Sequence, residues 1–480
     1  RCRDAEEIKM GKKLSLIGGG SVRTYYFIES LMKFCREMDI SQVAVMDNNG
    51  EKLRYFGGIA KYLCESTDSG LEVILTEDPV QALTDADYVV TTVRVGEDAA
   101  RTVDERTALN LGVIGQETTG AGGFSYAIRT IPTMIEYMKL IRRVAKPNAP
   151  VFNFTNPSGL VTQALYDAGF DNIIGICDNA TGIKIDVAEA LRVNASDLMV
   201  KVYGLNHLSW ANRVELGGVN ILPRLMRNDT FVQGFHQFAD FDRNLIRHLG
   251  QIPNGYLYYF YHREKALRNL EKAPESRGEF IRRNNEAMMA ELRRHDIEKE
   301  PQVCMDIYRD FMHRREGSYM SIELGEQVHV PPVDVESLGI RELLGNKPVT
   351  EVYEGYAGVV FNYIDAVKYD RGIDLAISVP NNGAIPGMEK DDVVEITCTI
   401  DHRGAVPMQF TKEEIDPSAF ALMKTIKRYE KLKGEAVARK DKAAAIEALT
   451  IHPLVQDYDL AVKLVDAYCK ANEPWIGQWK

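Results

Sequence analysis

Short apolar runs alternate with amphipathic stretches through the first part of the chain. In the amphipathic stretches, apolar residues recur every three or four positions, as they do over 25–35. An uninterrupted apolar run is typical of a buried parallel strand, and the three-to-four spacing is typical of a helix with one buried face. The pattern predicts strands over 13–17, 42–47, 71–75, 87–93, 151–154 and 173–177, with helices over 25–35, 51–64, 78–83 and 126–145.

Strands that alternate with helices in this way fold into a parallel, doubly wound sheet of the α/β class. Right-handed crossovers bring the carboxyl ends of all its strands to one edge, where ligands bind. After about residue 205 the alternation stops, and helices dominate the pattern. In this part we expect strands over 373–380 and 393–400, and helices over 243–249, 256–270, 278–294, 417–432, 440–449 and 457–471.

The length of 480 residues favours two domains, because single hydrophobic cores stop growing well before that size. We predict a Rossmann-type domain over 11–205 and a mainly helical α+β domain over 206–480 that docks on its rim. The first ten residues lack the apolar stretch of a signal peptide, and we interpret them as a tag remnant or an irregular terminus.

Composition and charge exclude several classes of protein. The net charge of −11 argues against a nucleic-acid surface, which would carry a basic stripe. Residues 149–166 carry no charged side chain, but prolines, asparagines and a glycine interrupt them, so they are not a membrane span. The seven cysteines are scattered and odd in number, without CxxC spacing. This usage fits a reducing cytoplasm rather than a disulfide framework, so we expect a cytoplasmic protein.

Three consecutive glycines follow the first predicted strand and precede the first predicted helix. Gly18 would allow a tight turn, and Gly20 would let the backbone approach a pyrophosphate at the helix N-terminus, next to Ser21. The third glycine of the G-x-G-x-x-G fingerprint is replaced by Arg23, so the match is imperfect. Asp47 ends the next predicted strand, where a carboxylate binds ribose hydroxyls and favours NAD over NADP. The alternative is a glycine-rich turn that binds nothing.

Cys177 and His207 each stand at the end of a strand-like run. A thiolate and an imidazole together can hold a transition metal and leave coordination positions open. The alternative is a buried strand-end cysteine and a core histidine. Use of Cys177 as a nucleophile is less favoured, because nothing near it in sequence resembles a paired base.

Polar and glycine-rich clusters recur where strand carboxyl ends are expected, at 94–96, 115–123, 153–157, 177–179 and 204–207. Together with 18–21, 315–319, 381–383 and 452–454, these clusters make the chain resemble glycoside hydrolase family 4. The resemblance implies a fold like that of lactate and malate dehydrogenases, one NAD, and usually Mn²⁺ or another divalent transition metal. It also implies a phosphorylated disaccharide or glucoside as substrate, and a homodimer or homotetramer.

Within the family, the segments at 153–157 and 204–208 look most like those of the 6-phospho-β-glucosidases. Asp178 departs from this pattern, because those enzymes typically carry asparagine after the metal-binding cysteine. An aspartate there resembles the 6-phospho-α-glucosidases, in which it is the candidate acid for the leaving group. The resemblance therefore favours the β-glucosidases and leaves the α-glucosidases as the alternative.

The mechanism that the resemblance implies begins with oxidation at carbon 3 of the sugar and loss of the proton on carbon 2. Elimination of the aglycone, addition of water and return of the hydride follow. Tyr256 resembles the family's base, although an unperturbed tyrosine titrates near about 10 and needs a nearby cation. The expected substrate-binding residues are Arg94, Asn153 and Arg277, and Glu117 completes the cofactor-binding set as a supporting group.

Two other functions stay open from the residues themselves. A 2-hydroxyacid dehydrogenase would share the fold and the cofactor, but it usually relies on a His–Asp pair and needs no metal. A non-enzymatic NAD-sensing module is favoured if Cys177 and His207 lie far apart in space.

Overall fold

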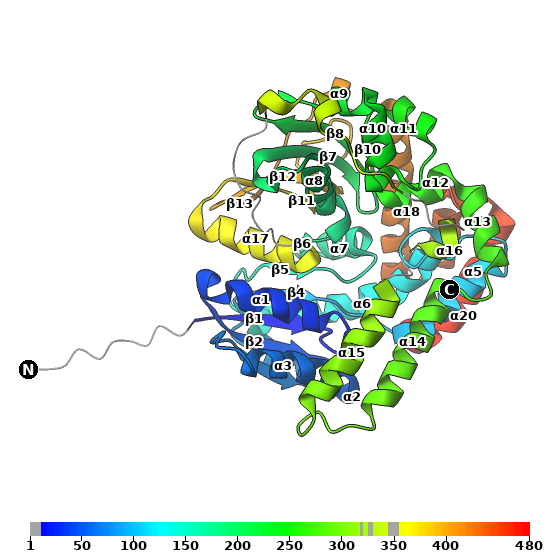
Figure 1. The fold of residues 1–480 in the computed structure, drawn as a ribbon. Helices are drawn as coiled ribbons and strands as arrows, with labels where there is room; N and C mark the ends of the chain where they lie inside the picture. The colour runs from blue at the N-terminus through cyan, green and yellow to red at the C-terminus, as the bar shows by residue number, and fades with distance from the viewer. Residues whose placement is uncertain (1–10, 317–319, 325–329, 344–354) are drawn as a thin grey trace, which may run out of the picture.

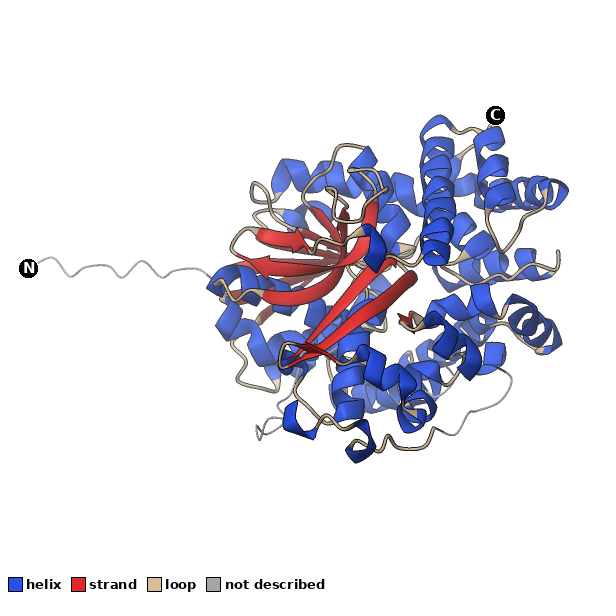
Figure 2. Cartoon of the chain, turned by 90° about the horizontal axis from the view of Figure 1, so that it is seen from above, coloured by secondary structure: helices blue, strands red, loops and turns tan. Residues whose placement is uncertain are grey.

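The computed structural model describes residues 11–316, 320–324, 330–343 and 355–480. Within them a nine-stranded sheet of order β13-β12-β11-β6-β5-β4-β1-β2-β3 runs through the molecule, with helices on both faces (Figure 1, Figure 2). The strands from β3 to β6 in this order pair in parallel. They are β1 Lys12–Ile17, β2 Ile40–Met46, β3 Glu72–Thr76, β4 Tyr88–Thr91, β5 Val151–Asn153 and β6 Ile173–Gly175. The predicted doubly wound sheet of Rossmann type is therefore confirmed.

The strand order reverses direction between β1 and β4, which positions the ligand crevice. Connections to the two sides of this point leave on opposite faces of the sheet, so a gap opens at the carboxyl ends of the strands. Ile17 and Thr91 are partners in the ladder, and the backbone N–H of Thr92 donates to the Ile17 carbonyl at 2.7 Å. The turns that follow β1 and β4 are therefore neighbours at the mouth of the gap.

Helices pack on both faces because the parallel strands are apolar on both sides. The consecutive residues Val43, Ala44 and Val45 of β2, for example, point to alternate faces and are all fully buried. One face carries α1 Thr24–Met38, α3 Gly58–Glu65, α8 Asp178–Leu191 and α17 Gly355–Tyr369. The other carries α4 Pro79–Leu83, α6 Gly120–Val144 and α7 Ser158–Asp167.

Three strands from the last part of the chain extend the same sheet. They are β11 Ile373–Pro380, β12 Val393–Asp401 and β13 Gly404–Pro407, and all pair antiparallel. Strand β11 joins β6 through Ser378 and Gly175. The predicted strands at 373–380 and 393–400 are thus present, and the sheet crosses the predicted domain boundary at 205/206. The division into two domains stays a prediction.

A second, smaller sheet is built on a hairpin of β7 Leu198–Leu205 and β8 Leu208–Leu216, with β9 Val219–Asn220 and β10 Ile252–Pro253 at its sides. Leu205 pairs with Leu208, so the hairpin turn consists of Asn206 and His207. His207 has φ +63°, a conformation in which histidine is enriched among non-glycine residues.

Several helical segments differ from the sequence prediction, and three of them have a clear physical reason. Helix α6 begins at Gly120 rather than at 126, so its first turn is rich in glycine. These glycines are required by close packing, since a Cβ at Gly122 would lie 2.4 Å from a backbone oxygen. The predicted helix 256–270 is divided into η4 Gly255–Leu257, α12 Tyr258–Tyr261 and α13 Arg263–Lys272, since His262 leaves helical geometry. Helix α5 Glu97–Leu109 was not predicted, because its buried face carries charged residues in ion pairs instead of an apolar stripe.

Outer helices complete the molecule. A pair, α14 Arg277–Leu292 and α15 Pro301–Glu316, packs on α1 and α3 through a separate apolar cluster. Helices α18 Pro417–Arg439, α19 Lys442–Ile451 and α20 Tyr458–Ile476 pack on one another and on α6. The shorter segments are α2 Gly50–Lys52, η1 Leu53–Gly57, η2 Ala195–Asp197, α9 Leu222–Arg227, α10 Asp229–Gly234, η3 His236–Phe238, α11 Arg243–Leu249, α16 Ser321–Leu324, η5 Glu336–Leu338, η6 Arg341–Leu343 and η7 Lys412–Glu414. No helix among the described residues is both long and apolar enough to cross a membrane.

Candidate active site

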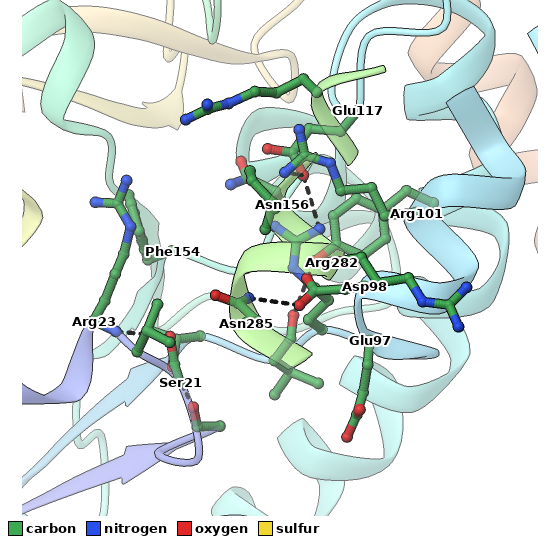
Figure 3. A pocket seen from close by; sticks show the side chains of 18 of the residues that line it. Ser21, Arg23, Glu97, Asp98, Arg101, Glu117, Phe154, Asn156, Arg282 and Asn285 are labelled. Atoms are coloured by element: carbon green, nitrogen blue, oxygen red, sulfur yellow. Dashed lines mark hydrogen bonds and ion pairs between the residues drawn. The ribbon is translucent and has the colours of Figure 1, made fainter. Parts of the chain in front are cut away.

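The carboxyl ends of the parallel strands open into a cavity of about 1120 Å³. Its walls come from the turns after β1, β2 and β4, the start of α8, the β7–β8 turn and helix α14. Figure 3 shows side chains that line it, with Arg23 and Phe154 on one side and Glu117 and Arg101 on the other. The predicted site residues that line it are Gly18, Gly20, Ser21, Asp47, Arg94, Glu117, Cys177, Asp178, His207, Tyr256 and Arg277.

The glycine loop after β1 lies flat against the ends of the neighbouring strands. Gly18 has φ +92°, and a Cβ there would stand 2.6 Å from the carbonyl carbon of Thr92. The N–H of Gly20 donates to Oδ2 of Asp47 at 2.8 Å, and a Cβ on Gly20 would meet that carboxyl group at 2.7 Å. A side chain at either position would collide with Thr92 or Asp47 and push the loop away from the strand ends. The glycines thus keep the loop where a pyrophosphate at the start of the following helix could approach the backbone.

Asp47 connects the glycine loop with the beginning of α5. Its second carboxylate oxygen accepts from the N–H of Asn49 at 2.9 Å. Asn49 donates in turn to Glu97 at 2.8 Å, and Lys52 forms an ion pair with the same Glu97 carboxylate. Burial raises the pKa of Asp47, and the two backbone donors oppose that rise. The carboxylate lies in the cavity wall at the end of β2, where a ribose would meet it.

Cys177 and His207 come together although Cys177 follows a strand of the large sheet and His207 lies in the hairpin turn of the small one. Strand β6 ends at Gly175, so Cys177 is the residue that caps helix α8 rather than a strand residue. The Cys177 Sγ lies 3.4 Å from Nε2 of His207, and the other ring nitrogen, Nδ1, lies 2.9 Å from Oγ1 of Thr118. Burial lowers the pKa of His207 to about 4, which keeps the imidazole neutral, and raises the pKa of the Cys177 thiol.

The two donor atoms fit a single metal ion. Their separation of 3.4 Å is shorter than the sum of typical metal–sulfur and metal–nitrogen bonds, about 2.3 and 2.1 Å, so one ion can touch both. A neutral imidazole and a sulfur donor suit a transition metal, and two protein ligands leave other positions for substrate or water. The pairing does not fit a sensor in which Cys177 and His207 are distant.

Tyr256 stacks directly on the histidine of this pair. The ring centroids of Tyr256 and His207 are 3.7 Å apart, with an angle of 2° between the planes. Asn254 positions the tyrosine, since its side chain accepts from the Tyr256 N–H at 3.0 Å while its own N–H donates to the Ser209 carbonyl at 2.9 Å. The β8 strand therefore holds Tyr256 and His207 in one rigid unit.

Asp178 is the first residue of α8 and faces the glycine loop. Its carboxylate lies 3.6 Å from Arg23, and about half of each side chain is exposed. The guanidinium of Arg23 is also 5.8 Å from the ring centroid of Phe154. The residue that replaces the third glycine of the fingerprint thus forms an ion pair with the first residue of α8.

Glu117 is held between two arginines in the wall of the cavity. It contacts Arg94 at 2.7 Å and Arg101 at 3.1 Å, and its side chain is 18% exposed. Burial disfavours the carboxylate, but the attraction of Arg101 and Arg94 outweighs burial and holds the pKa of Glu117 at about 2. Glu117 therefore fixes the Arg94 guanidinium in place rather than offering a free carboxylate.

Arg277 is positioned by the first turn of α14. Ser276 and Glu279 form a capping box, and Glu105 of α5 accepts from the backbone of the same turn at 2.6 Å. The Arg277 guanidinium donates to the carbonyl of Arg315 at 3.2 Å. Gly317 to Tyr319, which belong to the predicted 315–319 cluster, lie outside the described residues.

The placement of Asn153 differs from the prediction. Its side chain is fully buried, and its carbonyl oxygen accepts from Thr91 Oγ1 at 3.0 Å and from the N–H of Thr155 at 3.2 Å. Its amide nitrogen donates to Thr162 Oγ1 at 3.0 Å and to the Ser158 carbonyl at 3.2 Å. Because both ends of the amide are bonded to β4, the β5–α7 turn and α7, the predicted contact with sugar hydroxyls does not fit. Asn153 shapes the turn instead.

Two models of known families cover most of the chain. The model of the family 4 glycosyl hydrolases matches residues 13–193, and the model of their C-terminal domain matches residues 202–455. The chain belongs to family 4 of the glycosyl hydrolases. The resemblance carried by the glycine-rich and polar clusters is thereby confirmed.

Similar family 4 enzymes include members of both anomeric types. The 6-phospho-beta-glucosidase of Escherichia coli (strain K12) is 28% identical over 479 residues, which cover 97% of each chain. A phospho-alpha-glucosidase of Clostridium acetobutylicum is 28% identical over 485 residues, covering 97% of this chain and 98% of that one. The structure of the 6-phospho-beta glucosidase of Thermotoga maritima with manganese, NAD⁺ and glucose-6-phosphate has a TM-score of 0.78 at 25% identity, covering 97% of this chain and all of that one.

Several cavity residues of this family 4 chain escaped the sequence prediction. Arg101 lines the cavity but stands in a helix whose charges resemble a solvated face. Arg315, the first residue of the predicted 315–319 cluster, also lines it, although no role was assigned to it. Asn156 also lines it, although within the predicted 153–157 cluster only Asn153 was assigned a role. Its position in the sequence could have predicted this, because Asn156 follows the end of β5 and such strand ends border the ligand gap.

Proposed function

We propose that this enzyme hydrolyses 6-phospho-β-glucosides through transient oxidation of the sugar. Most glycosidases place two carboxylates across the glycosidic bond, and NAD-dependent family 4 enzymes are an exception. The observation that carries the proposal is the Cys177–His207 pair, 3.4 Å apart, in the same cavity as the glycine loop. The relatives from Escherichia coli and Thermotoga maritima support the β-linked 6-phosphoglucoside as the substrate class.

The residues present fit both cofactors. When bound, NAD would take a hydride from carbon 3 and later return it, and a divalent metal such as Mn²⁺ would polarise the oxygens at carbons 2 and 3. Gly18, Gly20 and Ser21 would border the pyrophosphate, and Asp47 would bind the adenosine ribose. Cys177 and His207 would hold the metal.

Proton transfer falls to Tyr256. Oxidation at carbon 3 acidifies the proton on carbon 2. The phenol of Tyr256 lies beside the Cys177–His207 pair, because it stacks on His207. A cation at that pair favours the phenolate, which is the form that can accept a proton. Arg94 and Arg277 would hold the substrate, and their guanidinium forks suit its phosphate. Glu117 keeps Arg94 oriented for that contact.

Asp178 favours a second candidate, hydrolysis of 6-phospho-α-glucosides. Its carboxylate lies next to Cys177, beside the proposed metal ligands, where an acid for an α-linked leaving group would be needed. Rates on α- and β-linked aryl 6-phosphoglucosides decide between the two. Under the β proposal the wild type prefers the β-linked substrate, and Asp178→Asn keeps that rate within about threefold. A preference for the α-linked substrate that Asp178→Asn abolishes would replace it.

The overall proposal is tested with a chromogenic 6-phosphoglucoside. Hydrolysis that requires both NAD⁺ and Mn²⁺, without net formation of NADH, is the expected result. Stoichiometric NADH would instead identify a 2-hydroxyacid-type dehydrogenase. Binding of NAD without turnover of either kind would leave the chain as a sensor.

We also propose a cytoplasmic location, a homodimer or homotetramer, and a division into domains at 205/206. The six described cysteines are free thiols, which supports a reducing compartment. Size-exclusion chromatography with light scattering tests the assembly state.

A further inference from the structure

The last turn of helix α20 presents a tryptophan to the active-site cavity. Trp475 is 43% exposed, whereas Trp210 is fully buried. The indole of Trp475 belongs to the cavity wall, although it comes from the far end of the described chain. A large aromatic ring that stays exposed at the edge of a cavity, rather than singly on the outer surface, offers its face to a ligand.

A buried polar network fixes the position of this ring. Asn472, one helical turn before Trp475, is 1% exposed and donates to Ser125 Oγ at 2.8 Å. Its oxygen accepts from Arg129 at 3.1 Å, and Arg129 forms a buried ion pair with Asp104 at 2.7 Å. The Arg129 guanidinium lies 5.8 Å from the Trp475 ring centroid. The last turn of α20, which carries the indole, is therefore anchored to α5 and α6.

Contacts of the indole place it on the Asp47 side of the cavity. A Cβ on Gly96 would lie 3.1 Å from two carbons of the Trp475 ring, so the ring packs against this glycine. The next residue, Glu97, is bonded to Asn49 just after β2. The indole thus lies beside the turn after β4, which is linked to Asp47 through the hydrogen bonds of Asn49.

Helix α6 confirms this location from a second direction. Arg129, Thr133 and Tyr137 are spaced by four residues and share one face of the helix. Thr133 and Tyr137 line the cavity, and the Tyr137 hydroxyl is 4.0 Å from Sδ of Met46, the neighbour of Asp47. Trp475 lies over the first residue of this row. These three residues extend from the indole to the end of β2. Cys177 follows β6, which lies on the opposite side of β1 in the sheet.

We propose that Trp475 packs against the adenine ring of bound NAD and sets the affinity for the adenosine half of the cofactor. The inference rests on the proposed function, in which Asp47 binds the adenosine ribose. An indole offers adenine a flat apolar face, and loss of one such aromatic contact weakens binding of a base by about five- to a hundredfold.

Binding of the cofactor and of its fragments tests the assignment by calorimetry. Trp475→Ala should weaken NAD⁺ and ADP-ribose by a similar factor, about tenfold, and leave nicotinamide mononucleotide unchanged. Trp475→Phe should lose at most about threefold, because a ring remains. Tyr458→Ala is the matched control, since Tyr458 lies on the same helix, is 63% exposed and does not line the cavity. ADP-ribose affinity of Trp475→Ala within twofold of wild type would overturn the proposal.

Other outcomes separate this inference from the proposed function. Wild-type enzyme that binds neither NAD⁺ nor ADP-ribose would overturn the function itself. Unchanged ADP-ribose affinity together with a raised KM for a bulky aryl 6-phosphoglucoside would assign Trp475 to the aglycone instead. If Trp475→Ala does not fold, fluorescence decides, because ADP-ribose should quench a tryptophan signal in wild type that is missing in Trp475→Phe. Equal quenching in both proteins would overturn the assignment.

Discussion

The imidazole of His207 and the phenol ring of Tyr256 lie face to face, 3.7 Å apart and nearly parallel. Replacing Tyr256 by Phe keeps the stacked ring and removes the hydroxyl. We expect kcat to fall by about 10²- to 10⁴-fold, the usual contribution of a positioned acid or base, while Mn²⁺ affinity stays near that of wild type. Substrate deuterated at carbon 2 checks the role, since its exchange with solvent should disappear in Tyr256→Phe.

Tyr258→Phe is the control for that variant. Tyr258 is fully buried in the next helix, and its hydroxyl is 3.4 Å from the carbonyl of Glu323. Its loss should leave turnover nearly unchanged. Persistent exchange of the deuterium in Tyr256→Phe would exclude Tyr256 as the base.

Substitution of Cys177 by serine should affect metal binding without affecting NAD binding. The hydroxyl of Cys177→Ser is a poorer ligand for a transition metal than a thiolate, so Mn²⁺ affinity should fall by at least about tenfold and hydrolysis should be lost. NAD⁺ affinity should persist, because the glycine loop and Asp47 do not contact the thiol. Manganese binding is followed by the EPR signal of the free ion. Cys35→Ser, a buried cysteine in the α1 core, should keep activity, and full activity in Cys177→Ser would refute the metal assignment.

Glu117 should stabilise the fold as well as orient Arg94. In Glu117→Gln the two arginines lose the carboxylate between them, and removing one partner from a largely buried ion pair destabilises a protein by about 3 kcal/mol. The free energy of unfolding in urea at pH 7 measures this loss. Glu97→Gln, whose carboxylate is 48% exposed beside Lys52, should change it by less than about 1 kcal/mol.

The same substitution has a defined pH dependence. The pKa of Glu117 in the folded protein is about 2, below the ordinary value of about 4.3. Its contribution to stability is therefore complete above about pH 4.3 and is lost as the pH falls towards 2. The difference in unfolding free energy between wild type and Glu117→Gln should be constant from pH 7 to 5 and smaller at pH 4. A difference that grows on acidification would contradict the assignment.

Residues near one another in sequence were the most predictable part of this molecule. Apolar runs and glycines predicted the strands and the loop at Gly18, because a buried strand and a tight turn impose local requirements. The role of Asn153 was misjudged, since a strand-end amide can bond to its own turn as readily as to a ligand. Arg101 and Trp475 were missed because their helices reach the cavity through long-range packing, which leaves no periodic signal in the sequence.

The glycines of the cavity provide the last prediction, because they differ sharply in what they tolerate. Gly18 has φ +92°, and a Cβ there would lie 2.6 Å from the carbonyl carbon of Thr92. Gly182, in the middle of α8, also lines the cavity, but a Cβ there would meet nothing within 4 Å. Gly18→Ala therefore combines backbone strain of about 1–3 kcal/mol with a clash that only movement of the β1 turn can relieve.

We expect Gly18→Ala to lose NAD⁺ binding and to unfold at a lower temperature than wild type. Gly182→Ala should bind NAD⁺ like wild type and be more stable by about 0.5–1 kcal/mol, because alanine favours a helix interior over glycine. Calorimetric titration with NAD⁺ and thermal unfolding of the two variants make the comparison. Equal losses in both would mean that any methyl group in this cavity disturbs the cofactor, whereas a loss confined to Gly18→Ala traces it to the turn that brings the backbone to the pyrophosphate.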